Sequence, residues 1–150
     1  MFEIDRVIVT VAVVLAAFVL TASAAIADGI DPGLWKITGH IETAGVIGPP
    51  HESSKCLTAE QTNDLGATFS PISATVNSVC APIDRTLKGP ILTWHLVCTG
   101  QLNMDMSGEF NFDSPHHYTG MVRTKAEMTG MPPVDSQNTI EGQWVSACPQ

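Results

Sequence analysis

The chain of 150 residues lacks the short motifs by which many enzyme classes are identified. It contains no glycine-rich phosphate loop, no dinucleotide-binding fingerprint and no GxSxG nucleophile motif. No pair of carboxylates falls on the apolar side of an expected strand, so neither a glycosidase nor an aspartic-type dyad is supported. We therefore predict that the protein is not an enzyme, and we assign it no catalytic residue and no cofactor.

Basic residues are also scarce. Lys and Arg number 7 against 15 Asp and Glu, the formal net charge at pH 7 is −8, and the basic residues form no cluster. Nucleic acids and anionic membrane surfaces both attract clustered Lys and Arg. The composition thus makes both of them poor partners.

The four cysteines show neither CxxC spacing nor a Cys/His finger pattern, so we predict no metal site for them. They follow an N-terminal segment that resembles an export signal. An apolar run from Val7 to Leu20 precedes the small residues "TASAAIADG", which is typical of a cleaved signal peptide. We assign residues 1–27 to the signal peptide and 28–150 to one β-rich domain. An uncleaved membrane anchor is the alternative.

An even number of cysteines after an export signal predicts two disulfides and a periplasmic or secreted protein. With the signal peptide removed, we expect no stable membrane insertion. No internal repeat or low-complexity tract divides the remaining chain.

The first half of the domain gives weak structural signals. "LWKITGHI" predicts a strand with Trp35, Ile37 and Ile41 on one side, and "AGVIGPPHESSK" predicts a loop. Thr58 and Gln61 match a capping box, so we predict one short helix near residues 58–65, ended by Gly66.

The second half alternates strictly between apolar and polar residues, as in "NMDMSGEFNFD" at 103–113. A turn centred on Gly89 places Cys80 opposite Cys98, within disulfide reach, and leaves Cys56 to pair with Cys148. A second turn is centred on Gln101 and a third on Pro115. The final strand is expected over 140–148. Together these hairpins predict an antiparallel meander.

The predicted register places apolar residues opposite one another. The second turn pairs Leu92 with Phe110, Trp94 with Gly108, Leu96 with Met106 and Cys98 with Met104, and the third pairs Phe112 with Tyr118, Phe110 with Gly120, Gly108 with Val122 and Met104 with Ala126. On the other side Asp105 faces Lys125. Aromatic residues opposite glycines, together with glycines on the apolar side, predict a curled sheet. The expected fold is mainly β, a half-barrel or small barrel.

Four segments in this order, "PGLWKIT", "CLTAEQ", "TWHLVC" and "GQWVSACP", resemble the bacterial family of exported proteins known as domain of unknown function 3617. The resemblance covers residues 31–149 and implies a periplasmic location in a Gram-negative bacterium. It carries no established activity or site residues, and it is consistent with structural cysteines. Ser146 departs from the glycine that is usual in the last motif.

The histidines and methionines are candidate metal ligands or catalytic residues. Met104 and Met106 share a face, and thioethers bind Cu(I), but methionine more often fills core space. His116 and His117, with Asp113 nearby, favour a solvated hairpin tip over a metal site. His95 faces Ser107, but no third residue supports a hydrolase.

Three hypotheses follow. The first is a non-catalytic envelope module that binds a protein or has a structural role. The second is a carrier or sensor of a small apolar molecule on the concave face. Its expected lining is Trp94, Met104, Met106, Phe110, Phe112, Tyr118 and Trp144. The third is binding of Cu(I) or another soft metal through Met and His.

Overall fold

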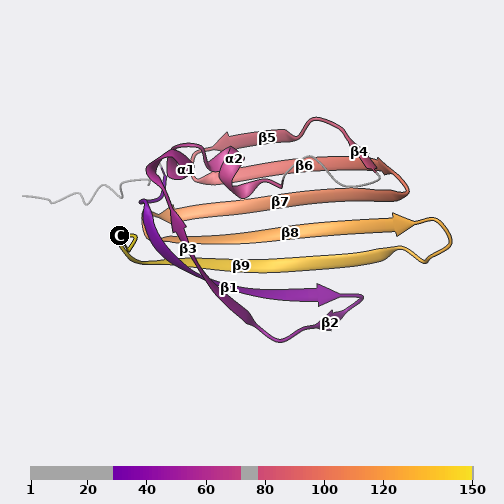
Figure 1. Cartoon of the computed structure of the whole chain (residues 1–150), viewed down its shortest axis with the longest axis horizontal. Helices are drawn as coiled ribbons and strands as arrows, with labels where there is room; N and C mark the ends of the chain where they lie inside the picture. Colours follow the sequence, from indigo (N-terminus) through magenta and orange to yellow (C-terminus); the bar gives the residue numbers. More distant parts are fainter. Residues whose placement is uncertain (1–28, 72–77, 150) are drawn as a thin grey trace, which may run out of the picture.

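A single antiparallel sheet with two short helices makes up the computed structural model, which describes residues 29–71 and 78–149 (Figure 1). Its elements in chain order are β1 (Gly33–Thr43), β2 (Val46–Ile47), β3 (His51–Leu57), α1 (Ala59–Asn63), α2 (Leu65–Phe69), β4 (Ser78–Cys80), β5 (Asp84–Lys88), β6 (Ile91–Gly100), β7 (Leu102–Ser114), β8 (His117–Met128) and β9 (Val134–Ser146). The strand order is β2-β1-β9-β8-β7-β6-β4. In addition, β3 pairs with β1 and β5 with β6. The two outer ends of this order do not pair, so the part of the sheet described here is open.

The predicted meander is confirmed in its central strands. All four pairs predicted between β6 and β7 are present, including Trp94 opposite Gly108. Between β7 and β8 the predicted partners of Met104, Gly108 and Phe110 are also present. The predicted pair of Phe112 and Tyr118 falls in an irregular stretch between Asn111 and Ser114, where the ladder gives Phe112 no single partner. Their rings still lie near each other, with centroids 6.0 Å apart.

The turn at Gly89 is wrong in detail. Cys80 does lie opposite Cys98, as predicted. In β5, however, Leu87 faces Leu92 and Lys88 faces Ile91, one residue out of step with a turn centred on Gly89. The hairpin closes through two residues, Gly89 and Pro90, and Gly89 has a positive φ of 55°. The short break between β4 and β5 absorbs the extra residue.

The predicted loop over 44–55 is also wrong, because most of it forms β2 and β3. Residues of β3 pair with β1 from Gly39 opposite His51 to Gly33 opposite Leu57. Six of the seven β3 residues are exposed, since β3 is an edge strand. An edge strand with little burial has no apolar alternation, and for that reason no pattern in residues 51–57 predicts a strand.

The predicted helix is confirmed over α1, and its capping box is present. The backbone nitrogen of Gln61 donates to Thr58 Oγ1 at 3.3 Å, and the backbone nitrogen of Thr58 donates to Gln61 Oε1 at 3.0 Å. Gly66 does not end the helical segment. Asp64 caps a second helix, α2, by accepting a hydrogen bond from the Ala67 nitrogen at 2.8 Å, and Gly66 lies inside that helix.

The last strand begins earlier than predicted. β9 starts at Val134 and ends at Ser146, so Cys148 lies beyond it. The early part of β9 reads "VDSQNT" and carries few apolar residues. It lies in the half of the sheet that the helices do not reach, where no buried face imposes an apolar pattern.

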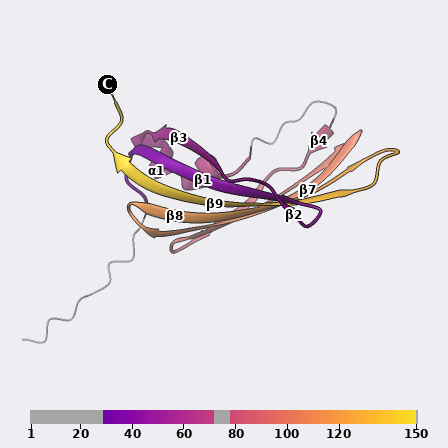
Figure 2. The same ribbon diagram turned by 90° about the horizontal axis from the view of Figure 1, so that it is seen from below.

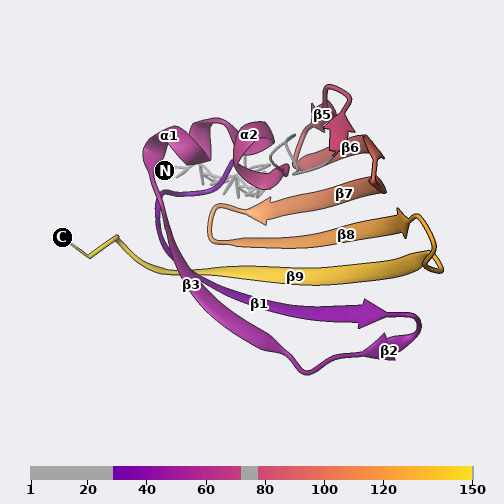
Figure 3. The same ribbon diagram turned by 45° about the vertical axis from the view of Figure 1, so that its right-hand side comes forward.

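The helices cover only one half of one face of the sheet (Figures 1 and 3). Viewed from below, α1 lies on one side of the sheet (Figure 2). We call this side the inner face, and the half under the helices the covered half. The buried core lies there: Ile30, Trp35, Leu57, Leu65, Leu92, Trp94, Phe110, Phe112 and Tyr118. In the other half, the distal half, inner-face residues are more exposed. Ile41, on the predicted side of β1, is 47% exposed.

Both predicted disulfides are present, Cys56–Cys148 and Cys80–Cys98. Within the described residues, no helix is long and apolar enough to cross a bilayer. The predicted signal peptide or anchor falls in residues 1–28, outside the described part of the chain.

Candidate functional site

Aromatic rings lie flat over glycines along the inner face of the sheet. Trp94 of β6 covers Gly108, Phe110 of β7 covers Gly120, and Tyr118 of β8 covers Gly142. A Cβ atom at any of these glycines would collide with the ring above it. The glycines therefore let three rings from successive strands form a continuous apolar floor.

A cleft of about 340 Å³ opens above this floor, between the sheet and the end of α2. We call it the inner-face cleft. From the sheet it is lined by Ile37, Trp94, Met106, Phe110, Tyr118, Val122 and Ile140; from β3 by Lys55 and Leu57; and from the segment at α2 by Thr68, Phe69, Ser70 and Pro71. Its volume lies within the range of small-molecule sites, near the lower limit.

Phe69 fixes the position of α2 over the sheet. Its ring packs against three core rings, with centroid distances of 5.2 Å to Phe110, 5.0 Å to Phe112 and 4.9 Å to Tyr118. The last two contacts are edge-to-face, a favoured geometry for aromatic pairs. The second helix therefore acts as a fixed wall of the cleft.

The polar groups of the cleft are few. Within residues 29–71 and 78–149, no Asp or Glu lines it, and Lys55 is the one charged lining residue. Burial raises the pKa of Tyr118 to about 12, so this phenol stays neutral at physiological pH. The hydroxyls of Thr68 and Ser70 already donate to the carbonyl oxygens of Gln61 and Gly66.

The indole nitrogen of Trp94 differs from the hydroxyls of Thr68 and Ser70, which have hydrogen-bond partners. Trp94 is 4% exposed, and its Nε1 is buried without a hydrogen-bond partner among the described residues. The edge of the ring that carries Nε1 lies over Gly108, between Met106 and Phe110 on the same strand. An unpaired N–H donor thus lies at the floor of an apolar cleft. Buried donors in proteins are rarely left unpaired.

Four of the seven residues predicted to line an apolar site do line this cleft: Trp94, Met106, Phe110 and Tyr118. Phe112 is fully buried beneath Phe69. Trp144 lies at the end of the sheet, where its Nε1 donates to the Pro32 carbonyl at 3.2 Å and its ring stacks on His116.

Met104 lies in the distal half opposite Ala126, away from the cleft. Of the two candidate soft-metal ligands Met104 and Met106, only Met106 is among the residues that line the cleft.

Several lining residues were not predicted as site residues. Lys55 and Leu57 belong to the edge strand β3, which the sequence did not reveal, and Phe69 belongs to the unpredicted α2. Val122 and Ile140 were identifiable, because each belongs to the apolar side of a strand that was predicted.

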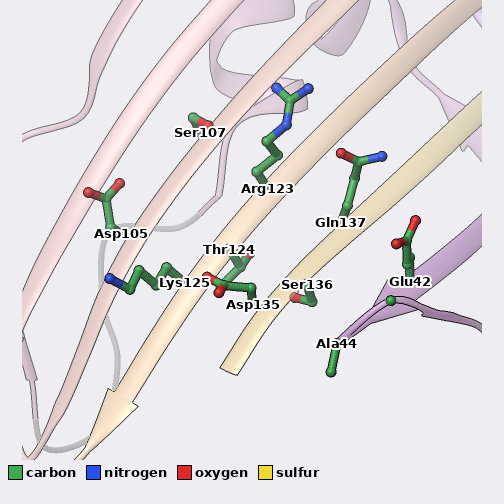
Figure 4. A pocket seen from close by; sticks show the side chains of 11 residues that line it. Glu42, Ala44, Asp105, Ser107, Arg123, Thr124, Lys125, Asp135, Ser136 and Gln137 are labelled. Carbon is green, nitrogen blue, oxygen red and sulfur yellow. The ribbon is translucent and has the colours of Figure 1, made fainter. Parts of the chain in front are cut away.

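A second depression, of about 430 Å³, lies on the opposite, outer face (Figure 4). Its side chains rise from β7, β8 and β9, with Glu42 and Ala44 at the end of β1. It is polar and carries both charge signs. Lys125 forms an ion pair with Glu127 at 3.2 Å, next to Asp105 and Asp135 across the sheet. Such mutually compensating exposed charges are typical of a solvated sheet face.

Three histidines hydrogen-bond carboxylates, His95 and His117 on the outer face and His116 in the turn after β7. His95 Nε2 lies 2.7 Å from Asp105, and among the described residues His95 bonds Asp105 and not Ser107, its register partner. Asp105 thus bonds His95, although it faces Lys125 in the ladder as predicted. The predicted neighbours His95 and Ser107 are therefore not hydrogen-bonded to each other among the described residues.

His116 and His117 turn to different partners. His116 lies 3.0 Å from Asp31. His117 is held between Asp113 at 2.7 Å and Glu141 at 3.2 Å. The hydrogen bond to Asp113, and then that to Glu141, raises the pKa of His117 above 6.5, although burial opposes the shift. The described residues contain no group of three or more His, Cys, Asp or Glu arranged to hold a metal ion.

Comparison with known proteins gives one match. A family model described as "Protein of unknown function (DUF3617)" matches residues 30–148. No curated protein and no solved structure matches the chain.

Proposed function

This chain belongs to the DUF3617 family, whose description assigns no activity, and from its geometry we propose that it is a non-catalytic binding protein for a small apolar molecule. The observation that carries the proposal is the inner-face cleft, with its floor of three aromatic rings and its fixed wall at Phe69. Apolar lining with few, well-placed polar groups is the usual character of small-molecule sites.

The proposal also includes the compartment. Two disulfides are characteristic of proteins that fold in an oxidising environment. We therefore propose that the protein works in the periplasm or outside the cell, where an apolar molecule needs a carrier or a sensor because water solvates it poorly.

The test is titration with an uncharged fluorescent probe, N-phenyl-1-naphthylamine. We expect saturable binding that Val122→Phe weakens about tenfold or more, because a larger side chain fills the cleft. Val97→Phe is the matched control. Val97 lies on the outer face of β6, 36% exposed, and this variant should bind as the wild type does.

Circular dichroism confirms that both variants are folded. Absence of saturable binding in the wild type, or equal affinity in the two variants, would overturn the proposal. Mass spectrometry of protein purified from its own host, under native conditions, then shows which molecule it carries.

A second candidate function, binding of another envelope protein, is supported by exposed apolar side chains on the distal half of the inner face. Ile41, Met128 and Val134 are each 44–48% exposed there. A photo-crosslinking residue placed at Val134 should give one discrete adduct in cells, and the same residue at Val97 should give none. Equal, diffuse labelling at both positions would contradict this function.

A further inference from the structure

The polar groups of the inner-face cleft are complementary to one kind of ligand. Among the described residues that line the cleft, one side chain is charged, the Lys55 ammonium on β3. No acidic residue is among the described residues that line the cleft, and Lys55 takes part in none of the ion pairs between them and the rest of the described chain. The matching ligand carries a negative charge joined to an apolar body.

We propose that the cleft selects a single-chain anionic amphiphile with a carboxylate head, a fatty acid. The inference rests on the proposed function and adds the ligand class to it. The acyl chain lies on the floor formed by Trp94, Phe110 and Tyr118, and the carboxylate pairs with Lys55 at the mouth. Because Lys55 is exposed and the aromatic floor is buried, the charged end remains near water.

The cleft volume sets the length of chain that it encloses. At about 30 Å³ for each non-hydrogen atom, the volume of one water in the liquid, the cleft holds about eleven such atoms. A medium-length acyl chain fills this space. Burying each methylene contributes about 0.8 kcal/mol, so the chain supplies most of the affinity and the head group the selectivity.

The preference for an anion is local. The chain as a whole carries a formal charge of −8, which repels anions at long range. Screening reduces that repulsion beyond roughly 10 Å at ordinary salt concentrations, whereas Lys55 acts at contact distance. We therefore expect the selectivity to depend on this one side chain.

The experiment compares three probes that share one alkyl chain: decanoate, 1-decanol and decyltrimethylammonium, each measured by calorimetry below its micelle concentration. Wild-type protein should bind decanoate best and decyltrimethylammonium worst. In Lys55→Gln the affinity for decanoate should fall about threefold, the effect expected of an exposed ion pair, while that for 1-decanol stays within error. Lys55→Glu should reverse the order of the two charged probes.

Lys125→Gln is the matched control, since it removes one positive charge from the outer face and should leave all three affinities unchanged. Equal affinity for decanoate and 1-decanol in the wild type, or an unchanged preference in Lys55→Gln, would overturn the fatty-acid assignment and leave the proposed function intact. Failure of all three probes to bind would instead contradict the proposed function itself.

Discussion

Gly108, Gly120 and Gly142 carry the aromatic floor, and each has a ring from the preceding strand lying over it. Glycine normally weakens a strand, because it loses more backbone entropy on folding and has no side chain to pack. Here the packing of the ring offsets that cost. Because these three residues have no side chains, the rings can lie flat on the sheet and leave the space of the cleft above them.

The first prediction concerns this floor. Gly108→Ala should lower the free energy of unfolding by about 1–3 kcal/mol, because the new Cβ collides with the Trp94 ring and forces it to shift. Urea denaturation followed by circular dichroism measures the change. Gly66→Ala is the contrast. It lies in α2 against the flexible end of Arg85, and alanine favours helix, so stability should be unchanged or higher.

The second prediction concerns His117. The raised pKa means that the folded state holds the proton more tightly than the unfolded state does. This stabilisation is complete below about pH 6.5 and disappears as the pH rises through the folded-state pKa. His117→Gln should therefore reduce the loss of stability seen between about pH 5.5 and about pH 8.5.

His40→Gln is the control for that experiment. His40 lies on the outer face and takes part in none of the ion pairs between described residues. The variant should keep the pH dependence of the wild type. An identical pH dependence in His117→Gln would contradict the role assigned to the contacts with Asp113 and Glu141.

At the scale of elements, the strands of the meander were predictable from the sequence, whereas the edge strand β3 and the helix α2 were not. Strands β6, β7 and β8 alternate because their inner faces are buried, and their short connections fix the register. The edge strand β3 has one buried residue, so burial left no pattern in its sequence. The second helix depends on Asp64, whose capping role emerges only once the chain turns there. These two elements supply Lys55, Leu57, Thr68 and Phe69 to the cleft lining. The aromatic floor was therefore predictable from the sequence, and the wall above it was not.

The third prediction concerns the pairing of the cysteines. In Cys80→Ser, Cys98 should be the one cysteine that reacts with a thiol label under non-denaturing conditions or after unfolding without reductant. Peptide mapping identifies the labelled residue. Label on Cys56 or Cys148 would contradict the pairing. On the loop-entropy model, the loss of this link costs about 3 kcal/mol of stability.

For the whole molecule, the two disulfides hold opposite ends of the sheet. Cys56 adjoins Leu57, which lines the cleft, and its link to Cys148 spans 92 residues. Cys98 lies toward the far end of β6, and its link to Cys80 spans 18 residues. The first therefore ties β3 and the helical cover to the end of β9. The second fastens β4 to the distal half, away from the cleft.

The last prediction separates these two roles. The double variant Cys56→Ser/Cys148→Ser should weaken binding of N-phenyl-1-naphthylamine and lose about 4–5 kcal/mol of stability, because β3 is released from the chain end. Cys80→Ser/Cys98→Ser should keep the affinity of the wild type at a temperature where both variants are folded, even though it is also less stable. Binding measured together with hydrogen exchange provides the comparison. Faster exchange confined to β4 and the end of β6 in the second variant, with binding intact, means that the cleft depends on the covered half alone. Equal loss of binding in both variants would show instead that the sheet responds as one unit, and the division into two halves would fail.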